Sequence, residues 1–296
     1  MIKSSTTTAD NTYFNKKDCN ECDVVVLKNI TLTTAGTKTN RDLKLYQGAE
    51  LIVGSGTTYN INSLALRRDN DTVSSLFMNG GTLNITENIY FDLIVTPDKW
   101  HYISLPGSFS FSNLIFRNGK SATLNVDYLA RHYDGQYRAT NLRNGWKTVS
   151  CDSIFTSGQG FIFGLSDDYK KKEFRFTFSK SILAQEAVNK TILNLHAWGN
   201  ESDVAPNHKG WNLIGNPFMS YFNAEMFDKI RIDSLAETLD SHGNWTGGWE
   251  LSGTSRGRSC RYAVIPSDDT EDVSAGGYKS VMLGDLKLSP FTCFFV

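Results

Sequence analysis

The sequence predicts an all-β protein, and three observations support this fold class. Its 18 Phe, 12 Tyr and 6 Trp stand beside 24 Gly and many Thr, Ser and Asn, which is a composition typical of strands and tight turns. Between residues 23 and 95, apolar side chains recur at every second position, and that period indicates strands with one buried face. Turn-forming residues follow one another roughly 8–12 residues apart.

Residues 1–22 form a polar leader without the apolar core of a signal peptide. It contains the pair Cys19 and Cys22, and the other cysteines are Cys151, Cys260 and Cys293. An odd count with scattered spacing gives no disulfide framework, and a single C-x-x-C lacks the second pair that a zinc knuckle needs. We expect a local loop here, with or without a disulfide.

Residues 23–96 are predicted to form a strand-turn repeat region. Apolar residues recur at every second position, at Leu43 and Leu45 and then at Leu51 and Val53, and Gly48 and the Gly-Ser-Gly at 54–56 separate the short strands. Such a pattern favours an irregular β-solenoid, and one sheet of a β-sandwich is the alternative, because no strict repeat length decides between them.

Residues 97–296 are predicted to form a β-sandwich-like body with two related units, 97–165 and 209–296. Both units open with the pattern W-x-x-I-[small]-x-P, as "WHYISLP" and "WNLIGNP", and both close with a strand dense in Phe. The proposed structural corners are Trp100, Pro106, Trp211, Gly215 and Pro217. Pro217 forces Asn216 into an extended conformation and ends the ladder, so a sheet corner explains "GWNLIGNPF" without a ligand.

Between the units, "KKEFRFTFSK" alternates Phe174, Phe176 and Phe178 with polar residues and is the clearest single strand. Helix signals are few. "NAEMFDKIRI", which starts at Asn223, could form two turns, and "SKSILAQEAVNK" is ambiguous.

These motifs resemble a family. "GWNLIGNPF" is similar to the W-N-L-[IV]-G-N-P-[YF] segment of large secreted and surface proteins of Bacteroidetes, many of which carry type IX sorting tails. "KWHYISLP", "GQGFIFG" and "SPFTCFFV" resemble the companion segments, with Thr-Cys in the last where Gln-Gly is usual. The resemblance implies an extracellular or cell-surface β protein that belongs to a longer chain, and it supplies no catalytic residues.

Two familiar motifs are absent from the sequence. It contains no phosphate-binding Gly-rich loop and no H-x-x-x-H pair among its five His. The pattern favours a protein that is not an enzyme and that carries no cofactor. A formal net charge of -1 argues against nucleic acid, and the lack of a long apolar run argues against membrane insertion.

Two acidic clusters are candidate calcium or glycan sites, because carboxylates can bind calcium or act in pairs on glycans. One cluster holds Asp69 and Asp71, and the other lies within "SDDTEDVSAGG" at residues 267–277. Charged turns are the simpler interpretation, and calcium stays a possibility. A solenoid lyase would need Asp with Arg or Lys on one face, whereas the adjacent Arg67 and Arg68 point to opposite faces of a strand.

Two loops rich in aromatic residues are the candidate ligand-binding segments. Flat rings flanked by amides and carboxylates suit the apolar faces and hydroxyl edges of sugars, although the same rings could simply pack on the body. The candidates are Tyr133, Tyr137, Trp146, Trp245 and Trp249.

The sequence therefore predicts a non-catalytic adhesion, scaffold or glycan-contact module with a glycan or another surface protein as its partner. The alternatives are a carbohydrate-active enzyme, such as a polysaccharide lyase or glycosidase, or its accessory domain, and a structural spacer or phage-associated structural protein.

Overall fold

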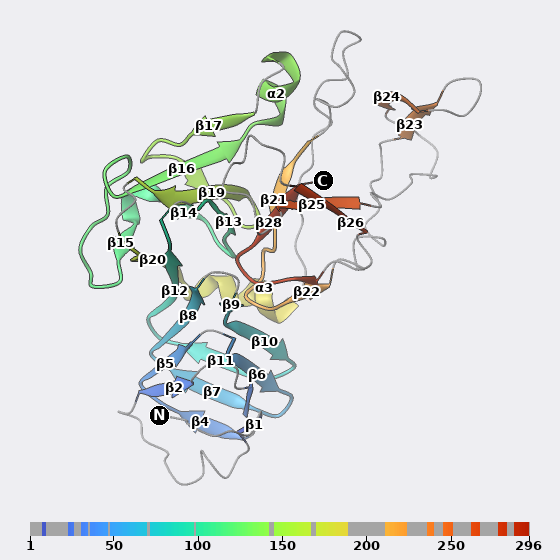
Figure 1. The fold of residues 1–296 in the computed structure, drawn as a ribbon. Helices are drawn as coiled ribbons and strands as arrows, with labels where there is room; N and C mark the ends of the chain where they lie inside the picture. Colours follow the sequence, from blue (N-terminus) through green and yellow to red (C-terminus); the bar gives the residue numbers. More distant parts are fainter. Residues whose placement is uncertain are drawn as a thin grey trace.

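The computed structural model confirms that the chain is all-β (Figure 1). It describes residues 8–9, 23–26, 31–34, 36–46, 48–69, 72–97, 99–141, 145–166, 170–188, 211–223, 236–239, 245–250, 262–266, 278–282 and 287–295.

The first part of the chain winds through three parallel sheets in turn, so each turn of chain adds one strand to each sheet (Figure 1). The first sheet, called sheet A here, contains β2 (Val24–Val26), β5 (Asp42–Leu45), β8 (Ser63–Asp69) and β12 (Asn88–Val95). The second contains β1 (Thr8–Ala9), β3 (Thr31–Thr34), β6 (Glu50–Gly54) and β10 (Ser75–Asn79). The third contains β4 (Thr37–Thr39), β7 (Thr58–Ile61) and β11 (Thr82–Ile85).

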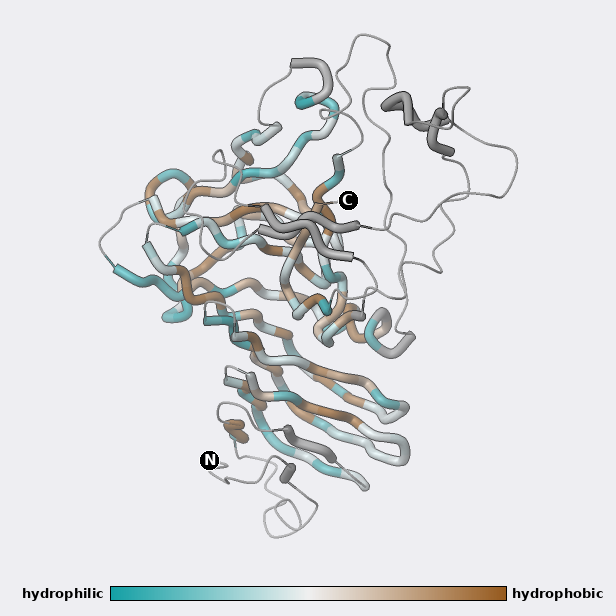
Figure 2. The backbone as a smooth tube through the Cα atoms, turned by 45° about the vertical axis from the view of Figure 1, so that its right-hand side comes forward, coloured by the Kyte–Doolittle hydropathy of each residue, from teal (hydrophilic) through white to brown (hydrophobic). Residues whose placement is uncertain are grey.

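Stacked apolar residues explain why this coil closes. Leu43 lies opposite Leu64, and Leu64 lies opposite Ile89, so equivalent positions are 21 (64 − 43) and 25 (89 − 64) residues apart. All three side chains are buried. The alternation of apolar and polar residues is visible along the strands in Figure 2. Because the turn lengths differ, no fixed repeat appears in the sequence.

Sheet A continues into the second part of the chain. β20 (Lys172–Ser179) pairs antiparallel with β12, and β15 (Ile115–Phe116) pairs antiparallel with β20. β9 (Thr72–Val73) pairs with β8. The predicted strand at Phe174, Phe176 and Phe178 is confirmed, and all three rings are buried.

The remaining strands form small antiparallel sheets, and the predicted β-sandwich is not confirmed. One sheet contains β13 (His101–Ser104), β19 (Gly160–Leu165), β16 (Tyr128–Tyr133) and β17 (Trp146–Thr148). Another contains β21 (Leu213–Gly215), β28 (Cys293–Phe295), β25 (Tyr262–Pro266) and β26 (Tyr278–Met282). The pairs are β14 (Phe109–Ser110) with β18 (Ile154–Phe155), β22 (Phe222–Asn223) with β27 (Lys287–Leu288), and β23 (Ala236–Leu239) with β24 (Trp245–Glu250).

The two Trp-led segments pair in the same way. β13 lies antiparallel to β19, with Ser104 opposite Gly160, and β21 lies antiparallel to β28, with Gly215 opposite Cys293. In each case the strand that follows the Trp pairs with the Phe-rich strand that closes the same segment. The unit boundaries at 97–165 and 209–296 stay a prediction.

The two segments also exchange backbone hydrogen bonds. The Ser104 N–H donates to the Phe291 carbonyl (3.2 Å), and the Gly215 N–H donates to the Gly158 carbonyl (2.8 Å). Gly158 and Phe291 both have positive φ angles, 76° and 61°. They occupy matching positions, two residues before Gly160 and Cys293, so the exchange is reciprocal.

A continuous apolar core joins the coil to the later sheets. The rings of Phe91 in β12 and Phe291 before β28 stack with their centroids 3.8 Å apart and their planes 9° apart. Phe176 in β20 packs against both Phe91 and Phe109. Side chains from the two ends of the described chain therefore share one core.

Helices are short, and one lies where the sequence indicated a loop. α2 (Gly135–Asn141) begins after Asp134, whose carboxylate accepts the Tyr137 N–H (2.8 Å) as a cap. The ambiguous segment "SKSILAQEAVNK" contains the 3₁₀ turn η2 (Lys180–Ile182) and α3 (Leu183–Val188); a further 3₁₀ turn, η1, spans Phe111–Asn113. Most of the two-turn helix predicted from Asn223 lies outside the described residues.

Candidate functional site

Two of the five predicted ligand-binding aromatic residues pack together between the two Trp-led segments. Tyr133 and Trp146 lie edge-to-face with centroids 5.5 Å apart. Both also contact Phe295 of β28, at 4.8 Å and 6.0 Å and with interplanar angles of 77° and 76°. Both are half-buried. These contacts join β16 and β17 to β28, so the two rings have a packing role.

The other three candidates lie elsewhere. Tyr137 is a half-buried residue of α2, and the Lys147 Nζ lies 4.5 Å above its ring while pairing with Asp134 at 2.5 Å. Trp245 and Trp249 belong to β24, opposite Leu239 and Glu237, and their side chains lie outside the described part of the structure.

The predicted corner residues lie at strand ends. Pro106, Gly215 and Pro217 are buried, whereas Trp100 and Trp211 are half-buried. The guanidinium of Arg131 lies 5.0 Å over the Trp100 ring, and that of Arg138 lies 6.0 Å over the Trp211 ring.

The side chain of Asn216, at the centre of the "GNP" corner, is held by backbone groups. Its side chain is fully buried, and Nδ2 donates to the carbonyls of Ser220 (2.8 Å), Ser289 (3.2 Å) and Leu288 (3.4 Å). Oδ1 accepts the Phe218 N–H (2.9 Å). This amide holds two loops together and leaves no atom to face a ligand.

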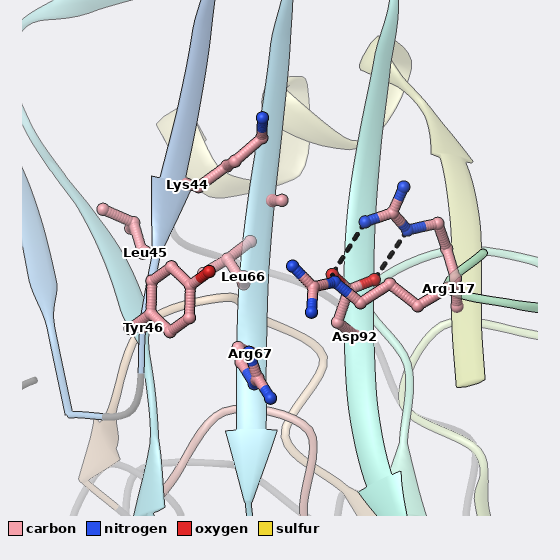
Figure 3. Close-up of a pocket in the computed structure, with 9 residues that line it drawn as sticks. Lys44, Leu45, Tyr46, Leu66, Arg67, Asp92 and Arg117 are labelled. Carbon is pink, nitrogen blue, oxygen red and sulfur yellow. Dashed lines mark hydrogen bonds and ion pairs between the residues drawn. The ribbon is translucent and has the colours of Figure 1, made fainter. Parts of the chain in front are cut away.

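A charged cluster on the outer face of sheet A was not found by sequence reasoning. Asp92 of β12 lies opposite Arg67 of β8 on one side and opposite Arg175 of β20 on the other. These residues, with Arg117 after β15 and Glu173 of β20, are called the arginine cluster here, and Figure 3 labels Arg67, Asp92 and Arg117 among them.

Ion pairs connect every member of the arginine cluster. Arg175 binds Asp92 through two hydrogen bonds, from Nε (2.6 Å) and from Nη2 (2.8 Å). Arg117 reaches both carboxylates, with Nε 3.5 Å from Asp92 and Nη1 2.9 Å from Glu173. Arg67 Nη2 donates to Glu173 (2.7 Å). Hydrogen bonds to Glu173 and Asp92 raise the pKa values of Arg117 and Arg175 above their ordinary value.

Tyrosine rings support two of the guanidinium groups. Arg67 lies 5.1 Å over the ring of Tyr46, and Arg175 lies 4.6 Å over the ring of Tyr90. Each contact fixes a cation against a flat apolar surface and favours it electrostatically. The cluster is therefore held in place before any ligand arrives.

A shallow hollow opens between the arginine cluster and β5. Lys44, Tyr46 and Arg67 line one part of it, and Asp92, Arg117 and Arg175 line the other (Figure 3). Its volume of about 30 Å³ is room for no more than a few water molecules. A larger ligand would lie across this face and could place only a small group in the hollow.

Sequence reasoning could reach only part of this arrangement. Arg67 faces outward, as the opposite-face argument requires, and Arg68 faces the other way, where its Nη1 donates to the carbonyls of Tyr102 (3.0 Å) and Phe291 (3.1 Å). Asp92 and Arg175 are 83 residues apart, and no local pattern places them on neighbouring strands. The strand register was the missing information.

Metal and acid–base candidates are weak in the described residues. No three His, Cys, Asp or Glu side chains described by the structure lie close enough to hold a metal ion. Asp69 pairs with Lys171 (3.2 Å), while Asp71 and the 267–277 cluster lie outside the described part. Burial lowers the pKa of His101 to about 4, and its Nε2 accepts the Thr96 N–H.

Comparison with known proteins gave no match to a protein-family model, to a curated protein or to a solved structure. Of the helices that the structure describes, none has the length and apolar character needed to cross a bilayer.

Proposed function

We propose that this protein is a non-catalytic glycan-contact module of the adhesion or scaffold class, located outside the cell or on its surface. The outer face of sheet A, at the arginine cluster, is its contact surface. The observation that carries the proposal is the register that sets Arg67, Asp92 and Arg175 side by side on three neighbouring strands.

A saccharide suits this surface because it needs both donors and acceptors. Guanidinium and ammonium groups donate to ring and hydroxyl oxygens, and carboxylates accept from hydroxyls. Arg67 and Lys44 provide the first kind of group, and Asp92 and Glu173 provide the second. Since the hollow cannot enclose a sugar ring, the surface favours an extended chain that lies across the strands.

The geometry disfavours a glycosidase at this site. A glycosidase needs one carboxyl group that carries a proton for the leaving oxygen. Here one guanidinium, that of Arg117, contacts both Asp92 and Glu173, and Arg175 occupies both oxygens of Asp92. Both carboxylates therefore serve as ion-pair partners within the arginine cluster.

A polysaccharide lyase is the second candidate, because Lys44, Arg67, Asp92 and Arg175 all line one face. A solenoid lyase needs an Asp together with Arg or Lys on one face of a sheet, and these four residues meet that condition, whereas the adjacent Arg67 and Arg68 point to opposite faces. Incubation with acidic polysaccharides, monitored by the ultraviolet absorbance of unsaturated chain ends, separates the two candidates. Appearance of that absorbance, and its loss in Arg67→Met, would establish the lyase.

Affinity electrophoresis against a panel of soluble glycans tests the proposed function. We expect at least one glycan to retard the protein, and the double variant Tyr46→Ala/Arg67→Met to migrate freely. Lys120→Met, at an exposed turn after β15, is the control and should behave like the unmodified protein. If the full panel leaves migration unchanged, the protein is better explained as a structural spacer.

A further inference from the structure

We propose that the glycan is acidic and that one of its carboxylate or sulfate groups binds Arg67 beside Lys44. This inference rests on the proposed function and adds the chemical class of the ligand. It also places the ligand chain across the strands of sheet A, from β5 towards β20.

The ion pairs on this face leave positive charge in excess. In the arginine cluster, three guanidinium groups face two carboxylates. Beside it, Arg41 and Lys44 both contact the carboxylate of Asp23, at 2.7 Å and 3.2 Å. Among the described residues, the arginine cluster therefore has one more cation than carboxylate. Asp42, further along β5, accepts the Ser63 hydroxyl and belongs to neither network.

Arg67 keeps more unused N–H donors than the other two guanidinium groups of the arginine cluster. Of the five N–H groups of a guanidinium, Arg175 uses two on Asp92, and Arg117 uses two on Asp92 and Glu173. Arg67 has one hydrogen bond to Glu173, while its buried Nε has no partner among the described residues. Lys44 directs one of its three ammonium protons to Asp23.

Both groups border the same hollow from adjacent strands. Lys44 belongs to β5 and Arg67 to β8 (Figure 3). Lys44 lies opposite Ala65, whose small side chain also lines the hollow. The side chain of Lys44 is 38% exposed and that of Arg67 is 15% exposed, so an anion can approach from solvent. A single oxyanion fits a hollow of about 30 Å³.

The two carboxylates select a glycan over a nucleic acid. Asp92 and Glu173 can accept hydroxyl protons from a sugar, whereas a phosphodiester backbone offers no donor there and would be repelled. Nucleic-acid binding also draws on many phosphate contacts and a strongly basic surface. The chain as a whole has a formal net charge of -1.

The direction of the ligand follows from the strand order. β5, β8, β12 and β20 are consecutive neighbours in sheet A. Neighbouring strands are about 4.8 Å apart, which is close to the advance per sugar unit in a linear polysaccharide. A chain laid across the strands would meet Lys44, then Arg67, then the Asp92–Arg175 pair with successive units.

Isothermal titration calorimetry with three polysaccharides tests this inference. The probes are polygalacturonate, which carries carboxylates, dextran sulfate, which carries sulfates, and neutral dextran. We expect binding to one or both acidic polymers, with an affinity that falls as salt is added. Arg67→Met should weaken that binding by about tenfold or more. Arg67→Lys should weaken it by less, because lysine keeps the positive charge but cannot bind an oxyanion through two parallel N–H groups.

Arg131→Met is the matched control, since it removes an exposed Arg from a different sheet and should leave the affinity within about twofold. Thermal unfolding of each variant verifies folding. If Arg67→Met does not fold, Lys44→Met provides the same test, with a smaller expected loss.

The possible results separate the two proposals. Binding of polygalacturonate alone or of dextran sulfate alone supports the inference and identifies the anionic group. Equal binding of neutral dextran overturns the acidic class and leaves the glycan-contact function standing. Binding to none of the three and to no glycan of the electrophoresis panel overturns both. Tighter binding of duplex DNA than of either acidic polymer overturns the choice of a glycan.

Discussion

Gly215 lies directly against Ser104, its counterpart in the other Trp-led segment. A Cβ atom placed on Gly215 would lie 2.1 Å from the Ser104 Cβ and 2.5 Å from its Oγ. The Ser104 hydroxyl donates to the Asn216 carbonyl (3.1 Å), so the two strand ends meet through one small residue on each side. The glycine is required by this contact and not by its backbone angles.

Substitution of Gly215 with Ala should destabilise the protein strongly. The new methyl group would also lie 2.7 Å from the Thr292 carbonyl oxygen, which belongs to the backbone and cannot rotate away. We expect a loss of about 3 kcal/mol in the free energy of unfolding, measured with urea, or failure to fold. Gly164→Ala is the control, because its nearest contact is 3.3 Å away, and its cost should be much smaller. Equal costs for the two variants would contradict this explanation.

Asn216→Asp should destabilise the corner more at pH 7 than in acid. The substitution keeps the shape but replaces an amide that donates to backbone carbonyls with a carboxylate that can only accept. We expect a loss of about 2–4 kcal/mol at pH 7, which should shrink at low pH, where a protonated Asp can donate once. Asn113→Asp, at an exposed position, is the control. Urea unfolding of both variants at two pH values gives the comparison.

Glu186 should make the protein less stable as the pH rises from about 4.5 to about 8. Burial raises the pKa of this carboxyl from 4.5 to about 8, although the Met219 N–H that it accepts at 2.5 Å opposes the rise. In that range the unfolded chain releases a proton that the folded protein keeps, so the free energy of unfolding falls, by about 1.4 kcal/mol per pH unit at most. Glu186→Gln should flatten this part of the pH profile. A profile with the same slope in the variant would refute the assignment.

Removal of Arg175 should cost far more stability than removal of Arg117. The Asp92 side chain is 7% exposed and accepts two hydrogen bonds from Arg175. Arg175→Met therefore leaves this buried carboxylate with only the longer contact to Arg117, at 3.5 Å. We expect about 3 kcal/mol for this variant. Arg117 is 37% exposed, and Arg117→Met should cost about 1 kcal/mol or less. Thermal or urea unfolding measures both losses. A similar loss from the two variants would show that the fold does not need the Arg175–Asp92 hydrogen bonds.

Trp146→Ala distinguishes packing from ligand contact at the aromatic residues that the sequence singled out. Because Trp146 packs on Tyr133 and Phe295, we expect a loss of about 2–4 kcal/mol in unfolding free energy. Glycan retardation in affinity electrophoresis should stay unchanged at a temperature where the variant is folded. If the variant is as stable as the unmodified protein but is no longer retarded by the glycan, Trp146 contacts the ligand.

The sequence predicted the β class and several strands because period-two alternation is a local signal. The pattern at Phe174, Phe176 and Phe178 gave the location of β20 directly. The repeated W-x-x-I pattern led to two segments that pair with their own closing strands. The coil was harder to predict, because its turns differ in length. Each of its three sheets also combines strands that are far apart in the sequence.

The candidate site was missed because it depends on long-range register. The residues opposite Asp92 belong to β8 and β20, and no spacing along the chain predicts which strands become neighbours. α2 was missed for a different reason: its residues are polar and include Gly135, and it exists because Asp134 caps it and Lys147 holds that cap in place.

The stacking of Phe91 on Phe291 has a consequence for biosynthesis. These rings are 200 residues apart (291 − 91), and Phe291 leaves the ribosome long after the coil has been made. Until then the end of the coil under Phe91 stays exposed, and closing so long a loop is slow. A nascent chain stalled before residue 291 should therefore depend on chaperones and be open to proteases, even though most of its strands are already present.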